Sequence, residues 1–150
     1  MRAILAAGLL VAMGGALAPA SGAEIEVKML NKGVEGMMVF EPALVKVALG
    51  DTVKFVPTDK THNAETIPGM LPDGAQAIAG KVDEEVTVAF DKEGIYGIRC
   101  KPHYGMGMVA MIVVGSPVNE QQAKAVVHPG KAKATFANLF AKMPSILAAH

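Results

Sequence analysis

The chain has 150 residues, with 14 basic and 14 acidic side chains and a single cysteine. This length suits one domain. The balanced charge excludes a nucleic-acid-binding protein of the usual kind, because such proteins carry a basic excess.

The N-terminal segment 1–22 predicts a secretory signal peptide. Arg2 precedes an uncharged apolar run over 3–18, and small residues follow it, as before a signal cleavage site. The run is shorter than the roughly 20 apolar residues of a membrane anchor. Cleavage could follow residue 20 or residue 22. Cleavage after residue 22 leaves a single mature domain, 23–150. A single cysteine cannot form a disulfide within the chain, which is unusual for a protein in an oxidising compartment. Metal ligation would explain it.

Short apolar or alternating segments predict an all-β domain that extends to about residue 115. Turn residues separate the segments, and their spacing favours an antiparallel sandwich. Along one strand, Tyr96, Ile98 and Cys100 share a face, so Cys100 is expected to point into the core. The predicted strands are 24–29, 37–40, 44–49, 52–56, 85–90, 95–99 and 109–114.

The last part of the chain predicts two helices, 117–127 and 131–143. Ser116 is suited to cap the first helix, and Pro144 is expected to end or kink the second. Between them, His128 is expected to be a surface loop residue. An apolar stripe on the second helix predicts packing against a sheet, and it consists of Phe136, Leu139, Phe140 and Met143.

The segment 100–108, CKPHYGMGM, concentrates the chemistry of the chain. Cys100, His103 and Met108 follow the spacing C-x2-H-x4-M between two predicted strands, with Pro102, Gly105 and Gly107 as turn residues. A thiolate, an imidazole and a thioether this close together predict a site for a soft metal. His62, after the strand 52–56, is the candidate for the fourth ligand.

Two histidines, one cysteine and a weak axial methionine are the donors of an electron-transfer copper site. Met106 competes with Met108, but Met108 lies where the next strand begins and is therefore held more rigidly. A structural zinc site is an alternative, although zinc rarely binds methionine. A copper storage or delivery protein is the second alternative, and it would need a site that opens. An enzyme is not expected, because four protein ligands leave no open coordination position.

The sequence resembles the blue-copper (type 1) cupredoxins, and the pseudoazurin family most closely. Two C-terminal helices distinguish that family from the plastocyanins, which share the loop spacing. The resemblance covers the whole mature chain, and it rests on the segments 29–33, 38–42, 50–53, 57–63, 65–67, 72–74, 96–97 and 100–108.

The resemblance implies a Greek-key β-sandwich of about eight strands with two C-terminal helices. It also implies one copper ion, with His62, Cys100 and His103 as equatorial ligands and Met108 as the axial ligand. Asn63 and Pro102 would lie around these ligands, and Asn63 would tie the two ligand loops together.

The resemblance also implies a function: a periplasmic, monomeric electron carrier without a membrane anchor. The carrier would transfer one electron by an outer-sphere route, as a donor to a nitrite reductase of denitrification. The electron is expected to leave through the edge of the His103 ring. Partner docking is expected at an apolar patch with Met38 and Met106, inside a basic ring of Lys32, Lys60 and Lys101 that attracts an acidic partner.

Overall fold

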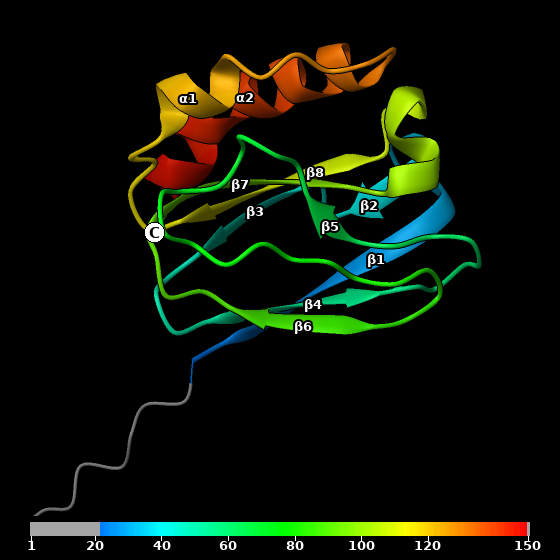
Figure 1. The fold of residues 1–150 in the computed structure, drawn as a ribbon, viewed down its shortest axis with the longest axis horizontal. Helices are drawn as coiled ribbons and strands as arrows, with labels where there is room; N and C mark the ends of the chain where they lie inside the picture. Colours follow the sequence, from blue (N-terminus) through cyan, green and yellow to red (C-terminus); the bar gives the residue numbers. More distant parts are fainter. Residues whose placement is uncertain (1–21, 150) are drawn as a thin grey trace, which may run out of the picture.

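A computed structural model describes residues 22–149 of the chain. The predicted signal peptide therefore lies outside the described residues, apart from Gly22. Figure 1 shows three layers: the helices lie on the outer face of one sheet, and the second sheet covers its other face. None of the helices within this described part is long and apolar enough to cross a membrane.

Eight strands form two four-stranded sheets, as the resemblance implies. The first sheet has the order β2-β1-β4-β6, with β2 at Gly36–Glu41, β1 at Glu24–Gly33, β4 at Thr52–Val56 and β6 at Val86–Ala89. The second has the order β3-β8-β7-β5, with β3 at Leu44–Val47, β8 at Val109–Val114, β7 at Gly94–Arg99 and β5 at Glu65–Thr66. β5 is the one strand that the local sequence pattern did not predict.

The expectation of an antiparallel sandwich is wrong for two of the six strand pairs. β1 pairs with β4 in parallel, and β3 pairs with β8 in parallel, while the remaining pairs are antiparallel. The chain leaves the first sheet after β2, places β3 in the second sheet, and then returns with β4 beside β1. Such crossovers set strand direction through topology, which short-range patterns do not record.

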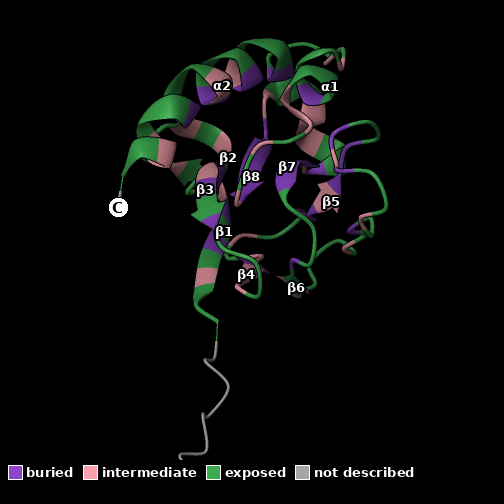
Figure 2. Ribbon diagram, turned by 90° about the vertical axis from the view of Figure 1, so that its left-hand side faces the viewer, coloured by how far each residue is buried: buried purple, intermediate pink, exposed green. Residues whose placement is uncertain are grey.

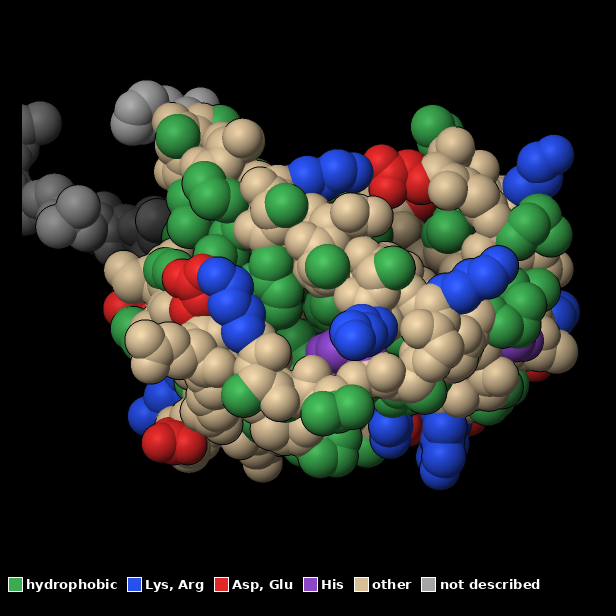
Figure 3. All heavy atoms as spheres, turned by 90° about the horizontal axis from the view of Figure 1, so that it is seen from above, with side chains coloured by type: hydrophobic (Ala, Val, Ile, Leu, Met, Phe, Trp, Pro, Cys, Tyr) green, Lys and Arg blue, Asp and Glu red, His purple; other side chains and the backbone are tan. Residues whose placement is uncertain are grey.

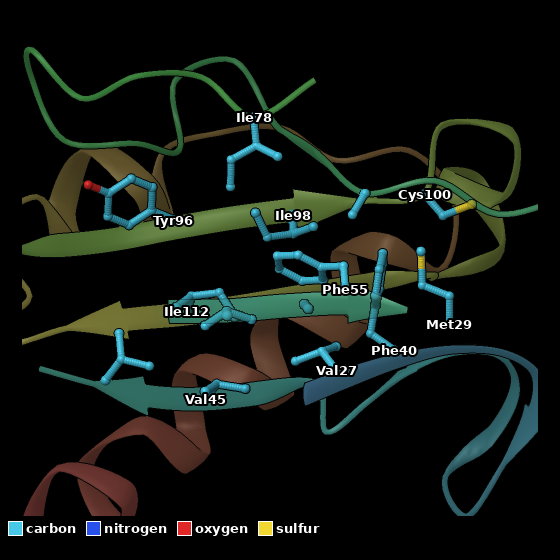
Figure 4. Packing of buried hydrophobic residues seen from close by; sticks show 14 of the residues in the cluster. Val27, Met29, Phe40, Val45, Phe55, Ile78, Tyr96, Ile98, Cys100 and Ile112 are labelled. Carbon is cyan, nitrogen blue, oxygen red and sulfur yellow. The ribbon is translucent and has the colours of Figure 1, made fainter. Parts of the chain in front are cut away.

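The core has two compartments, one on each side of the second sheet. In β8, Ala110, Ile112 and Val114 face the first sheet, and the alternate residues face the helices. Every residue of β8 is therefore buried, which explains its unbroken apolar sequence, and Figure 2 shows it between the helices and the first sheet. Figure 4 shows Tyr96, Ile98 and Cys100 in the inter-sheet compartment, as predicted, with Cys100 at one end near Met29.

The two C-terminal helices are present, with bounds that differ from the prediction. Helix α1 spans only Glu120–Lys124. Residues 116–119 form a turn instead, because the Asn119 side chain bonds both backbone groups of Ile95, accepting from its N–H at 2.7 Å and donating to its carbonyl at 3.0 Å.

Helix α2 spans Ala132–Ala148 and continues through Pro144, so the predicted end at residue 143 is wrong. Only one helical turn follows the proline. Leu147 packs against the helix-side core, and the Lys46 ammonium donates to the carbonyls of Leu147 at 3.4 Å and Ala149 at 2.8 Å. These contacts support the last turn despite the lost backbone hydrogen bond. The apolar stripe of α2 faces the second sheet, as predicted.

Candidate metal centre

His62 lies in the loop after β4, at the end of the sandwich where β7 also ends. Its side chain is fully buried. The preceding residue, Thr61, has φ +73, in the left-handed region that β-branched residues rarely adopt. Asp83 supports this loop: its carboxylate accepts from the Thr61 N–H at 2.6 Å, and its own N–H donates to the His62 carbonyl at 2.8 Å.

Cys100 directly follows β7, and the chain then forms the 3-10 helix η1 at Lys101–Met106 rather than an open hairpin loop. Pro102 lies in the first turn, where its missing N–H costs nothing. The helix is kinked at His103, with φ −117 and ψ 17, and it ends at Gly107 with φ +93. Of the predicted turn glycines 105 and 107, only Gly107 therefore uses the left-handed region.

The donor atoms of His62, Cys100 and His103 converge. The Cys100 Sγ lies 3.6 Å from His62 Nδ1 and 3.5 Å from His103 Nδ1, and the two Nδ1 atoms are 3.1 Å apart. Within residues 22–149 this is the one group of three or more metal-binding side chains of the His, Cys, Asp and Glu types whose ligand atoms all lie within 4.8 Å of one another.

A hydrogen bond on the far side of the ring sets the tautomer of His62. Its Nε2 lies 2.9 Å from the Asn31 side-chain oxygen, which can only accept, so we assign the proton to Nε2. Nδ1 then presents its lone pair toward Cys100 and His103. Burial, and next to it the neighbouring His103, lower the pKa of His62 below its ordinary value, so the ring stays neutral. A neutral imidazole with a free Nδ1 lone pair is ready to bind a metal.

The Cys100 thiol is also buried, and burial raises its pKa, although the backbone N–H groups of Asn63 and His103 oppose this shift. A thiolate in this position therefore needs a compensating cation. Two imidazole nitrogens and a thiolate suit copper or zinc among common metals. The donor chemistry thus fits the predicted copper ion.

Met108 is buried in the same core compartment as Cys100. Backbone hydrogen bonds join it to both other residues of the motif: the Cys100 N–H donates to its carbonyl at 3.0 Å, and its own N–H donates to the His103 carbonyl at 3.3 Å. Met106, its competitor, has 50% of its surface exposed. The burial of Met108 and the exposure of Met106 agree with the choice of Met108 as the fourth donor.

Asn63 bridges the two ligand loops. Its Oδ1 accepts from the Lys101 N–H at 2.7 Å, and its Nδ2 donates to the Gly80 carbonyl at 3.0 Å and to Glu65 at 3.2 Å. Glu65 in turn pairs with the Arg99 guanidinium at 2.7 Å. The loops that carry His62 and His103 are therefore held in one hydrogen-bonded network.

The residues predicted for docking have the exposure that such a role needs. The three lysines, Lys32, Lys60 and Lys101, are exposed, and each lies next to or within two residues of a site residue. Met38 is half-buried against the core, while its neighbour Met37 has 61% of its surface exposed.

Sequence analysis missed three supporting groups: Asn31 behind His62, Asp83 beside Thr61, and the pair Tyr104–His128 described below. Each makes its contact across more than 20 residues of sequence, so no local pattern identifies it. A potential signal was present for Asn31 and Tyr104, which lie in segments that carry the family resemblance, but not for Asp83 or His128.

Comparison with known proteins identifies the family. The profile described as copper binding proteins, plastocyanin/azurin family, matches residues 27–115. Pseudoazurin from Methylorubrum extorquens is 50% identical over 143 residues, which cover 95% of this chain and 97% of that protein. Pseudoazurin from Paracoccus pantotrophus is 48% identical over 117 residues, which cover 77% of this chain and 81% of that protein.

A solved structure agrees with these relatives. The crystal structure of pseudoazurin from Methylobacterium extorquens AM1 superposes with a TM-score of 0.78 at 54% identity, and the match covers 80% of this chain and 98% of that chain. The chain therefore belongs to the plastocyanin/azurin family of copper-binding proteins and, within it, to the pseudoazurins, which are blue-copper electron carriers.

Proposed function

We propose that His62, Cys100, His103 and Met108 hold one type 1 copper ion and that the protein carries single electrons between redox proteins of the periplasm. The observation that carries this proposal is the convergence of Cys100 Sγ and the two Nδ1 atoms on one point, within 4.8 Å of each other. Bound copper would supply a Cu(II)/Cu(I) couple, and no substrate bond would change.

The protein's contribution is to hold these ligands still. Asn63 joins the two loops, Asp83 supports the His62 loop, and backbone hydrogen bonds join Met108 to Cys100 and His103. Ligands that hardly move when the metal charge changes keep the energy of reorganisation low. This rigidity favours a carrier over a copper-delivery protein, which needs a site that opens, and delivery remains the alternative.

His103 is the proposed exit for the electron. It is half-buried, whereas His62 is fully buried, so His103 gives a partner the shorter approach. The exposed Met106 and the half-buried Met38 would supply apolar docking contacts. Weak redox complexes bury less than about 1,200 Å² in total, so a small patch is sufficient.

We propose that Lys32, Lys60 and Lys101 steer an acidic partner to this end of the molecule. On the helical face, lysine and arginine side chains are scattered, and some of them lie beside acidic side chains (Figure 3). The partner class that the family resemblance supports is a nitrite reductase of denitrification. The predicted signal peptide supports the periplasmic location, and a diffusing shuttle is best served by a monomer.

The visible spectrum tests the copper site. We expect the mature protein to turn intensely blue with Cu(II) and to bleach reversibly with ascorbate, because a Cys100 thiolate-to-copper bond gives that band. Cys100→Ser should abolish the band. Met108→Leu should shift the reduction potential, whereas the matched control Met106→Leu should leave it unchanged. A colourless protein that binds Cu(II) weakly would refute the carrier and favour copper delivery or a zinc site.

Stopped-flow kinetics with a copper nitrite reductase tests the partner. Replacing Lys32, Lys60 and Lys101 with glutamine should lower the association rate and flatten its dependence on salt. The control is a triple replacement of Lys92, Lys124 and Lys133, which are exposed and lie in segments that make no contact with the His62 loop. Equal effects of the two sets would remove the steering proposal.

A further inference from the structure

His128 lies outside the metal centre and yet contacts the loop that carries a metal ligand. Its Nδ1 is 2.7 Å from the hydroxyl of Tyr104, the residue that follows His103. Its ring also stacks on Phe136 of α2, with centroids 4.2 Å apart and planes 27° from parallel. His128 is half-buried, so the expectation of a plain surface residue misses its packing.

The other side of Tyr104 is held as well. The Arg99 guanidinium lies 5.2 Å from the centroid of the Tyr104 ring, and Glu65 fixes Arg99 through an ion pair at 2.7 Å. Glu65 also accepts from Asn63, the neighbour of His62. Tyr104 is therefore placed between the network of the first ligand loop and the C-terminal helices.

The backbone beside His128 binds the same loop. We call residues 125–131 the helix connector. The Lys131 N–H donates to the Gly105 carbonyl at 2.9 Å, and Gly130 has φ +52. A Cβ on Gly130 would lie 2.3 Å from the Gly105 oxygen, so only glycine permits this approach. Figure 1 shows the chain between α1 and α2 reaching the end of the molecule where η1 lies.

We infer that His128 is a positioning residue for the metal centre: through its hydrogen bond with the Tyr104 hydroxyl, it holds η1, and with it His103, against the helix connector. The inference rests on the proposed function, in which His103 is both a ligand and the electron exit. The C-terminal helices then have a role beyond covering the sheet, because they restrain the more exposed of the two histidine ligands. Neither Tyr104 nor His128 is assigned to bind the metal.

Hydrogen exchange tests this inference. The substitution His128→Phe preserves an aromatic ring over Phe136 but removes the ring nitrogen that makes the hydrogen bond, and Tyr104→Phe removes the hydroxyl from the other side. The readout is amide exchange, by NMR, of His103, Gly107 and Met108, whose N–H groups bond within the loop. One hydrogen bond of ordinary strength predicts about fivefold faster exchange at these amides. Exchange in β7 and β8 should not change.

Three comparisons make the result specific. The control Val127→Ala changes an exposed side chain of the same helix connector and should leave exchange unchanged. The double variant should exchange no faster than either single variant, because both remove the same bond. In the reduced copper form, a Cu(I) chelator should remove the metal about fivefold faster from His128→Phe than from the wild type, if one bond limits the opening of the loop.

The outcomes separate this inference from the proposed function. Unchanged exchange of η1 in both single variants would overturn the positioning role, as would an equal increase across β7, β8 and η1, which would mean a general loss of stability. Exchange is also measured on the metal-free protein. A protein that never forms the blue site would therefore refute the carrier and still leave the contact between His128 and η1 measurable. If His128→Phe does not fold, Tyr104→Phe alone decides.

Discussion

The Asp83 carboxylate accepts a hydrogen bond from the backbone N–H of Thr61 at 2.6 Å, and both residues have positive φ, +62 and +73. The Asp83 N–H also donates to the His62 carbonyl. Two loops that are separated by more than 20 residues are therefore joined directly beside a metal ligand. This pair accounts for the conformation of the loop that presents His62.

Replacing Asp83 with alanine should destabilise the protein by about 1–2 kcal/mol, because it removes a charge-assisted hydrogen bond that is partly open to solvent. Asp83→Asn should cost less, since asparagine retains an acceptor and tolerates positive φ. Chemical denaturation of the three proteins measures the difference. The control is Asp73→Ala, an exposed residue without a side-chain hydrogen bond or ion pair to the residues that the structure describes. Equal losses for Asp83→Ala and Asp73→Ala would contradict the prediction.

Thr61→Gly should stabilise the protein by about 1 kcal/mol. A β-branched residue at φ +73 costs about 1–3 kcal/mol, and the greater freedom of glycine in the unfolded chain offsets part of the gain. Thr58→Gly is the matched control, because Thr58 is an exposed residue of the same loop without positive φ, and there glycine should only destabilise. Denaturation midpoints compare the two. A loss of stability in both variants would show that Thr61 is not strained.

The metal centre was predictable because its donors lie at strand ends and three of them lie within nine residues. Alternation of side chains along β7 also placed Cys100 in the core correctly. The network around the donors was not predictable in the same way. Asn31, Asp83 and His128 contact partners that are distant in the sequence, and many other surface residues have equally suitable side chains.

Strand direction and helix bounds show the same limit. Local patterns identified seven of the eight strands, but the parallel pairs β1–β4 and β3–β8 depend on crossovers between the sheets. The short β5 has only two residues, too few for a pattern. The helix bounds depend on two such contacts. Asn119 bonds the backbone of Ile95, so α1 begins later than predicted. The last turn of α2 packs against the core, so α2 continues beyond Pro144, although proline usually ends a helix.

Pro144→Ala should stabilise the protein by about 1–2 kcal/mol. Proline inside a helix costs about 3 kcal/mol, but here only one turn follows, and proline also restricts the unfolded chain. The side chain is exposed, so no packing is lost. Pro117→Ala, in the turn before α1, is the control and should give no gain. The prediction fails if thermal and urea unfolding show that both substitutions change stability alike.

The stability of the copper-loaded protein should decrease as the pH falls below 6.5, and His128 should contribute to this decrease. Burial lowers the pKa of His128 below its ordinary value of 6.5. As the pH falls from 6.5 toward the lower pKa of the folded state, the unfolded chain binds more protons at His128 than the folded protein does, which favours unfolding. Above 6.5 the stabilising contribution of the neutral ring is fully present. Urea unfolding at a series of pH values measures the slope. His128→Phe should flatten it, by a modest amount because His128 is partly exposed, while Val127→Ala should not. If stability depends on pH equally in His128→Phe and in the wild type, His128 has the same pKa in the folded and unfolded states, and the prediction is wrong.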